Sequence, residues 1–138
     1  MLGITEKTRV VFGDSLGRCT ANPAFEERFY ELFLASSPKV AEKFATTDFV
    51  RQRRALRASL HTMLLAVTDS ADQLDKHLGP LAERHSSRDL DIGAELYDYW
   101  LDSLLTTVRE CDPAYSPEVR DAWKQVMSVG IAYLLSRY

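Results

Sequence analysis

The segment Leu78-Gly79-Pro80-Leu81-Ala82-Glu83-Arg84-His85 decides how the chain is interpreted. Its two leucines and its histidine recur three and four residues apart, which is the spacing of one face of an α-helix. Proline lacks an N–H and disrupts a running helix, so we predict that Pro80 starts a new short helix. A lone histidine on an apolar helix face is more often structural than a metal ligand, and this pattern by itself leaves both roles open for His85.

Outward from this segment, apolar residues keep helical spacing almost everywhere, and no alternating strand pattern of useful length occurs. The sequence therefore predicts an all-α fold. Three helix starts are marked by a capping side chain followed by proline, at Asn22-Pro23, Ser37-Pro38 and Ser116-Pro117. The expected helices cover about 5–18, 23–35, 38–44, 49–67, 80–85, 94–110 and 117–137, with a weakly helical region around 74–78.

The composition is that of one ordinary globular domain spanning residues 1–138. Its 17 Lys and Arg residues and 20 Asp and Glu residues give a net charge of −3, without a long run of either sign. This balance argues against nucleic acid or an anionic membrane as a partner. No apolar stretch approaches the roughly 18–20 residues that span a bilayer. The N-terminal residues lack a signal-peptide pattern, so we expect a cytoplasmic protein.

Tyr30 and Gln52 each place a hydrogen-bonding group on an otherwise apolar helix face. A buried polar group without a partner costs on the order of 1–3 kcal/mol, so the simplest hypothesis is that these two bond each other or backbone groups. The other two histidines, His61 and His77, lie among polar or charged neighbours and are predicted at the surface.

The sequence contains no arrangement typical of side-chain catalysis or of a directly bound metal ion. It has no close Ser/His/Asp or Cys/His set, no paired carboxylates, no glycine-rich phosphate loop and no His/Cys metal spacing. Any chemistry of this domain must therefore come from a bound cofactor.

Taken in order along the chain, five segments resemble parts of the globins, specifically bacterial single-domain haemoglobins and the globin domain of flavohaemoglobins. These segments are Phe29-Tyr30, Ser37-Pro38-Lys39-Val40-Ala41-Glu42-Lys43-Phe44, Gln52-Arg53-Arg54-Ala55-Leu56, residues 78–85 quoted above, and Asp121-Ala122-Trp123. Their order and spacing are highly specific and span nearly the whole chain. The resemblance implies a globin fold, a 3-over-3 helical sandwich in a single domain.

The resemblance also implies haem b as the cofactor, with His85 as its iron ligand and the Leu81 carbonyl holding the other ring nitrogen. Phe44 would stack on the porphyrin, and Tyr30 and Gln52 would be hydrogen-bond donors on the distal side. The other pocket residues that it implies are Leu56, Leu60, Leu81, Leu101 and Leu104 as apolar walls, and Arg84 at a haem propionate.

The implied partners are the diatomic gases oxygen, nitric oxide and carbon monoxide. Two distal donors of about 1–2 kcal/mol each would slow oxygen release by roughly one to three orders of magnitude. Such retention suits storage, scavenging or sensing better than rapid transport. One alternative is a nitric oxide dioxygenase served by a separate reductase; another is a signalling module with this fold and no haem, against which His85 argues. A monomer and a homodimer are both open.

The chain departs from the family pattern at two places near the implied site. Tyr97 matches the tyrosine of a Tyr–Glu pair that supports the proximal histidine in flavohaemoglobins, but the glutamate is missing where the last helix reaches Tyr138. The segment before Gln52 is shorter than in those relatives, so Arg53 and Phe49 are alternatives for the distal residue.

Cys19 and Cys111 are too few and too far apart in sequence for a disulfide scaffold or a metal site, and two reduced thiols are expected in the cytoplasm. In a globin fold, the turn after the first helix lies close to the end of the penultimate helix. A disulfide between the two cysteines is therefore the alternative that the resemblance raises.

Overall fold

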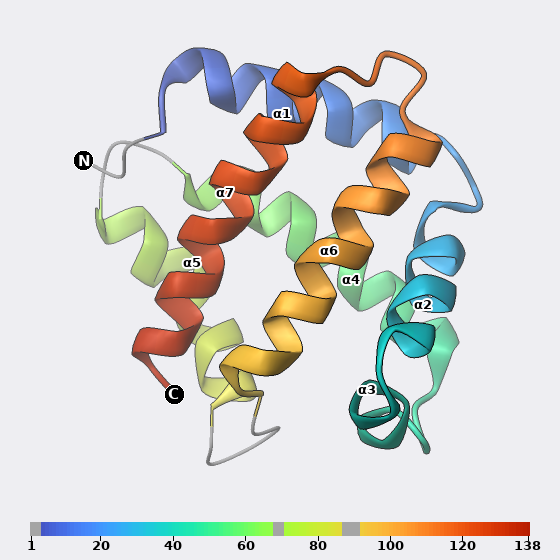
Figure 1. Cartoon of the computed structure of the whole chain (residues 1–138). Coiled ribbons are helices and arrows are strands. Elements are labelled where there is room, and N and C mark those ends of the chain that lie inside the picture. The colour runs from blue at the N-terminus through green and yellow to red at the C-terminus, as the bar shows by residue number, and fades with distance from the viewer. Residues whose placement is uncertain (1–3, 68–70, 87–91) are drawn as a thin grey trace.

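The computed structural model describes residues 4–67, 71–86 and 92–138, and at residues 71 and 72 it describes only the backbone. This part of the chain contains seven α-helices and no strand (Figure 1). The all-α prediction is confirmed. The helices are α1 (Glu6–Thr20), α2 (Phe25–Ser36), α3 (Pro38–Lys43), α4 (Phe49–Ala66), α5 (Ala71–His85), α6 (Ala94–Cys111) and α7 (Pro117–Ser136).

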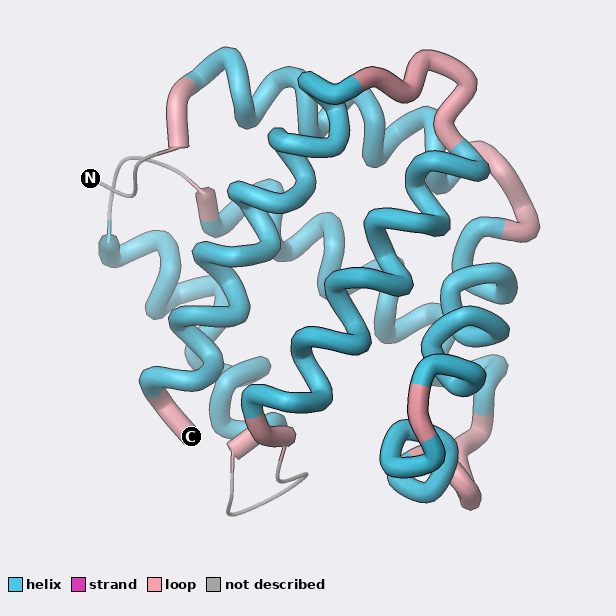
Figure 2. The backbone as a smooth tube through the Cα atoms, in the orientation of Figure 1, coloured by secondary structure: helices cyan, strands magenta, loops and turns pink. Residues whose placement is uncertain are grey.

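The helices form two layers. In the orientation of Figures 1 and 2, α6 and α7 lie side by side in front of α4 and α5, α1 crosses the top, and α2 and α3 flank α6. The closest packing joins α2 to α6, α1 to α7, α5 to both α4 and α7, and α6 to α7. This arrangement places the C-terminal end of α5 and the short α3 at opposite sides of the lower edge.

Two of the three predicted proline starts are confirmed. Ser37 accepts a bond from the Lys39 amide at the start of α3, and Ser116 accepts one from the Val119 amide at the start of α7. At the third, the helix starts two residues later than predicted, at Phe25 instead of Pro23. The Asn22 side chain accepts from the Ala24 amide and forms a turn before α2 begins. Asparagine favours such turns as readily as helix caps, which explains the difference.

Helix α5 continues through Pro80, so the prediction that this proline starts a separate short helix is wrong. Leu78 and Ala82, on either side of the proline, are 0% and 2% exposed, and their packing keeps both halves in one helix. Gly79 has no Cβ to clash with the proline ring, which removes part of the usual penalty on the residue before proline. Tertiary packing thus outweighs the hydrogen bond that Pro80 cannot make.

The centre of the core is aromatic. The Trp123 ring on α7 meets Phe12 edge-on, with ring centroids 4.8 Å apart, and both side chains are fully buried. Helices α4 and α7 cross closely at Gly130, where an added Cβ would lie 2.5 Å from the Met63 sulfur. A larger residue at Gly130 would therefore force Met63 to move.

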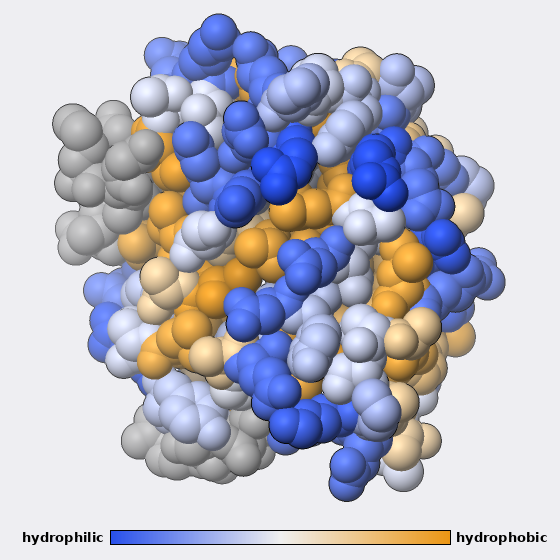
Figure 3. Space-filling model, in the orientation of Figure 1, coloured by the Kyte–Doolittle hydropathy of each residue, from blue (hydrophilic) through white to orange (hydrophobic). Residues whose placement is uncertain are grey.

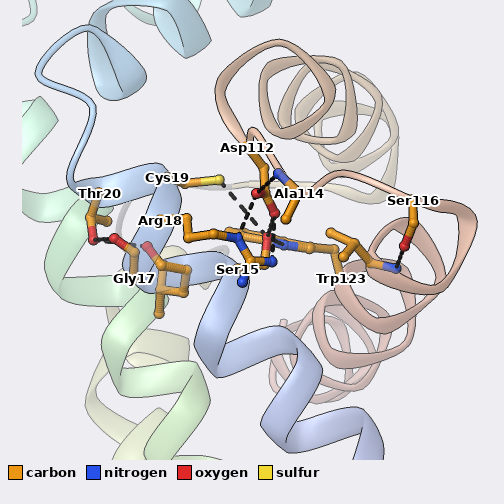
Figure 4. Close-up of polar contacts among 11 residues, drawn as sticks. Ser15, Gly17, Arg18, Cys19, Thr20, Asp112, Ala114, Ser116 and Trp123 are labelled. Carbon is orange, nitrogen blue, oxygen red and sulfur yellow. Dashed lines mark hydrogen bonds and ion pairs between the residues drawn. The ribbon is translucent and has the colours of Figure 1, made fainter.

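A buried polar cluster ties α1 to the turn between α6 and α7 (Figure 4). The Asp112 carboxylate accepts bonds of 2.6 and 3.0 Å from the Arg18 guanidinium, 2.6 Å from the Ser15 hydroxyl and 2.8 Å from the Ala114 amide. The Trp123 indole N–H in turn donates to the Ser15 oxygen at 2.8 Å. Burial raises the pKa of Asp112, but the donors outweigh it and hold this pKa below its ordinary value.

Both cysteines are free thiols in the structure, as predicted for reduced residues. Cys19 is buried beside Ser15, and burial raises the pKa of its thiol to about 12. The thiolate is the reactive form of cysteine, so Cys19 is protonated and unreactive at neutral pH.

The outer face of α7 carries a band of apolar side chains between hydrophilic ones (Figure 3). The large hydrophobic residues that are most exposed, Val10, Val50, Leu65 and Tyr138, are scattered over α1, α4 and the C-terminus. Among the described residues, no helix is long and apolar enough to cross a membrane.

Candidate functional site

His85 ends α5, and its ring is oriented by the backbone of its own helix. The His85 Nδ1 atom lies 2.9 Å from the carbonyl oxygen of Leu81, one turn earlier. Because a carbonyl only accepts hydrogen bonds, Nδ1 carries the proton and Nε2 carries the lone pair. Both residues are half-buried. The ring is thus set in the tautomer that coordinates a metal through Nε2.

Helix α5 is anchored on one side of the molecule. It packs on α4 and α7, and the exposed Asp75 carboxylate accepts bonds from the Tyr133 hydroxyl at 2.6 Å and from Arg137 at 2.9 Å. No comparable packing joins α5 to α2, α3 or α6 within the described ranges. His85 therefore stands at the end of a helix that packs on α7 and on α4, which carries Gln52 and Leu56, but not closely on α2, α3 or α6 within the described ranges.

Tyr30, on α2, is 6% exposed and points its hydroxyl at α4. The hydroxyl donates to the backbone oxygen of Gln52 at 3.4 Å, a long hydrogen bond. Burial raises the pKa of Tyr30 to about 12, while hydrogen bonding with Gln52 acts in the opposite direction. The phenol is therefore protonated at neutral pH and remains a donor. The Gln52 side chain is half-buried next to it.

The rings of Tyr30, Phe44 and Phe49 form a cluster that joins α2, α3 and α4. The Tyr30 ring lies 5.5 Å from Phe49 and 6.2 Å from Phe44, centroid to centroid, and both contacts are edge-on. Phe49 was an alternative distal residue, and the structure brings it, like Gln52, beside Tyr30. Arg53 is half-buried on the same helix, and Leu56, one turn after Gln52, is 4% exposed.

Tyr97, on α6, is 7% exposed, and its hydroxyl is the only buried side-chain polar atom without a hydrogen-bond partner in the described part of the chain. Burial raises its pKa to about 12. Leu101, one turn later, is half-buried. A buried hydroxyl without a partner costs about 1–3 kcal/mol, so the Tyr97 hydroxyl lowers the stability of the chain when no ligand is bound.

The remaining predicted polar residues lie at or near the surface. Arg84 is exposed beside His85. His61 is exposed, as predicted, and its Nδ1 lies 2.9 Å from the Arg57 carbonyl oxygen. His77 is half-buried, 3.2 Å from the Gln73 side-chain oxygen, so it is less exposed than we expected.

Sequence reasoning missed a hollow between α3, the start of α6 and the C-terminus. It is lined by Lys39, Glu42, Lys43, Gly93, Glu95, Leu96 and Tyr138. The Lys39 ammonium bridges to Glu95 at 3.0 Å across its mouth. Glu42 and Glu95 line it as well, so the two lysines are balanced by two carboxylates.

These residues fit a haem. Among the described residues, no group of three or more His, Cys, Asp or Glu side chains is placed to hold a bare metal ion. Phe44, Leu81 and Leu101 pack against the core but are only partly buried, so they retain apolar surface for a flat apolar group. The Tyr97 hydroxyl, buried without a partner among the described residues, is a polar group that a bound cofactor could satisfy.

Comparisons with known proteins agree with this interpretation. Residues 27–134 match the family model described as Globin. A crystal structure from Pseudomonas aeruginosa PAO1, of a protein described as structurally highly homologous to a human haemoglobin, superposes with a TM-score of 0.88 at 44% sequence identity. The match covers 95% of this chain and 98% of that chain. No curated protein matches the chain.

Proposed function

Because the chain belongs to the globin family, we propose that it holds haem b through His85 and binds a diatomic gas reversibly, with strong retention. The observation that carries this proposal is the fixed His85 ring, whose Nδ1 is held by Leu81. When bound, haem supplies an iron that coordinates oxygen, nitric oxide or carbon monoxide. The protein supplies the axial ligand, the dry apolar surround and the hydrogen-bond donors.

The proximal residues act on the ligand nitrogen. The Leu81 carbonyl keeps the proton on Nδ1 and restricts rotation of the His85 ring, so Nε2 presents its lone pair without a further conformational cost. Phe44, Leu56 and Leu101 would cover the faces of the macrocycle and exclude water. Arg84 would meet one of its carboxylates.

The distal residues act on the gas. Tyr30 stays protonated at neutral pH, since its pKa is raised to about 12. Its bond to the Gln52 carbonyl is long, so the hydroxyl can exchange it for a partly charged ligand at little cost. Each charge-assisted bond from Tyr30 or the Gln52 amide contributes about 1–2 kcal/mol. Retention of this kind favours storage, scavenging or sensing.

Haem uptake tests the proximal assignment. We expect wild-type protein titrated with haemin to bind it stoichiometrically and to develop a sharp Soret band. We expect His85→Ala to lose the native ferrous and ferric spectra, whereas His61→Ala, a change of an exposed histidine, leaves them intact. Native ligation in the His85→Ala protein would overturn the proposal.

Oxygen dissociation tests the distal assignment. We expect Tyr30→Phe to raise the oxygen off-rate about tenfold or more, because it removes a donor worth about 1–2 kcal/mol. Tyr115→Phe, in the turn between α6 and α7, is the matched control. An unchanged off-rate in Tyr30→Phe would remove this residue from the site. Sustained nitric oxide consumption with reductant would instead favour the dioxygenase alternative.

A further inference from the structure

We propose that the outward surface of α6 and α7, here called the α6–α7 face, binds a second copy of this chain about a two-fold axis. The charged side chains that define the face are Asp98, Asp102 and Arg109 of α6 and Lys124 of α7. The acids and the bases lie toward different ends of the face, so a second copy can bring its bases opposite these acids. The proposal goes beyond the proposed function, since the contact needs no bound haem.

Helices α6 and α7 form one continuous surface. They lie side by side at the front of the molecule in Figures 1 and 2 and pack closely on each other. The turn at 112–116 reverses the chain, so the first half of α7, with Lys124, lies beside the second half of α6, with Arg109. Asp98 and Asp102 lie in the first half of α6. The face is therefore acidic toward one end and basic toward the other.

The charges of α6 follow a single stripe. Asp98, Asp102, Leu105 and Arg109 are four, three and four residues apart, which places them on one side of the helix. The three charged residues are exposed, and Leu105 is half-buried. A stripe with acids in its first half and a base in its last turn is complementary to itself when two copies run antiparallel.

The four charges have no partner within the described part of the chain. Neither an ion pair nor a hydrogen bond is found there for the side chains of Asp98, Asp102, Arg109 and Lys124, whereas their charged neighbours on the same helices are paired: Glu95 with Lys39, Glu110 with Arg28, and Arg120 with Asp121. Asp98 and Asp102 are one helical turn apart, where like charges destabilise a helix. A cation from a second copy would relieve this repulsion.

The helix dipoles explain only one of these four charges. Arg109 lies in the last turn of α6, where the negative end of the dipole stabilises a cation. Asp98 and Asp102 lie beyond the first turn, where the effect has decayed, and Lys124 is inside the N-terminal half of α7, where no cation is favoured. Three of the charges thus contribute nothing to the stability of their own helix.

Apolar side chains lie between the charges. Figure 3 shows a hydrophobic band on α7 with hydrophilic residues on both sides. Ile131 and Leu135 are seven and eleven residues after Lys124, so they share its side of the helix, and both are half-buried. Neither belongs to the core or to the partly buried side chains that pack on it in the described residues. An apolar centre with a charged rim is the usual anatomy of a protein–protein interface.

The size and symmetry of the face suit a second copy. Helices of 18 and 20 residues are about 30 Å long and about 10 Å wide, so the pair offers a flat area on the order of 500 Å². Such an area is typical of a small interface, and we expect a weak dimer. An axis in the face, perpendicular to α6 between Asp102 and Leu105, lays the two copies of α6 antiparallel. Asp98 of each copy then lies opposite Arg109 of the other. A nucleic acid or an anionic bilayer would instead be repelled by the acidic end.

The test is the oligomeric state of the full chain as purified, measured by sedimentation velocity over a range of concentrations at low and high salt. The double variant Asp98→Arg/Asp102→Arg makes the face uniformly basic, and Arg109→Asp/Lys124→Asp makes it uniformly acidic. Arg51→Asp/Arg54→Asp, at exposed positions of α4, is the control that makes the same charge change as the second variant.

We expect the wild-type chain to dimerise with a micromolar Kd at low salt and more weakly at high salt. Each of the two face variants should weaken its own dimer about tenfold or more, whereas an equimolar mixture of the two should form a heterodimer at least as tight as the wild-type dimer. The control variant should change the Kd by less than about twofold.

The mixture separates this proposal from a general effect of charge, because only two surfaces that face each other are restored by pairing opposite reversals. A mixture that stays monomeric overturns the proposal, as does equal weakening in the control variant. A wild-type chain that is still monomeric at about 500 µM and low salt also overturns it, since a specific interface of this size would be populated there. A dimer that neither face variant weakens places the interface elsewhere and overturns it too.

Discussion

We predict that Asp112→Asn lowers the free energy of unfolding by about 2–3 kcal/mol. The wild-type carboxylate is completely buried and accepts from Arg18, Ser15 and the Ala114 amide. Asparagine keeps one oxygen for the Ala114 amide, but its NH₂ group then faces the donors of Arg18 or Ser15. The substitution therefore removes a charge and opposes two donors to each other, without leaving a cavity.

The magnitude follows from how deeply each partner is buried. Removing one member of a fully buried ion pair costs about 3–5 kcal/mol, because the other charge is left without a counterion. The Arg18 side chain keeps 33% exposure, so water can solvate its guanidinium once it is released. Because water reaches part of the Arg18 side chain, we expect a loss of about 2–3 kcal/mol, smaller than for a fully buried pair.

The same contacts predict a pH dependence. The pKa of Asp112 is lower in the folded chain than in the unfolded chain, where it is about 3.9. Its contribution is therefore fully present above about pH 5 and is lost as the pH falls through the folded pKa. Since asparagine cannot ionise, the gap between Asp112→Asn and wild type should be full at pH 7 and should close at strongly acidic pH.

Urea unfolding of haem-free samples, followed by far-ultraviolet circular dichroism, measures the effect without a ligand equilibrium. Asp121→Asn is the matched control, because Asp121 is exposed and pairs with its neighbour Arg120 at 3.4 Å; we expect a change below about 0.5 kcal/mol. An Asp112→Asn protein as stable as the control, or a gap that persists unchanged in acid, would refute the account of the buried cluster.

Three further substitutions test packing and the site. Tyr97→Phe removes the unpartnered hydroxyl, so the haem-free protein should gain about 1 kcal/mol in urea unfolding, and a loss would mean that the hydroxyl has a partner. Gly130→Ala should gain less than the roughly 1 kcal/mol of an unhindered helical Gly→Ala change, because the flexible end of Met63 must move away from the added methyl group. Gly17→Ala, a helical position with no atom within 4 Å of the added Cβ, should instead gain up to about 1 kcal/mol, and similar results for both glycines would contradict the close crossing.

Local chemistry was enough to predict most of the helices. Ser37 caps α3 by accepting from the amide of its second residue, and Ser116 caps α7 by accepting from the amide of its third residue. Proline follows both serines. Such signals depend only on neighbours in sequence. Pro80 was misjudged because its outcome depends on Leu78 and Ala82 packing against other helices, and sequence periodicity does not weigh that packing against a lost hydrogen bond.

Contacts between distant residues were beyond prediction for the same reason. Arg18 and Asp112 are 94 residues apart, and nothing in the local sequence of either distinguishes a buried pair from two exposed charges. Trp123 was recognised through the family resemblance, but its bond to Ser15 depends on α1 crossing α7. The pairing appears only once the helices are placed.

The site residues can be sorted by how fully the chain satisfies their polar groups. Ser15 and Thr107 also lie on buried helix faces, and their hydroxyls make short bonds, of 2.6 Å to Asp112 and 2.7 Å to a backbone carbonyl. Tyr30 makes only a 3.4 Å bond, and the Tyr97 hydroxyl has no partner among the described residues. Periodicity alone treats these four residues alike. Because unmet hydrogen-bonding capacity is costly in a core, its concentration at Tyr30 and Tyr97 is what the proposed haem site predicts, whereas Ser15 and Thr107 are satisfied within the fold.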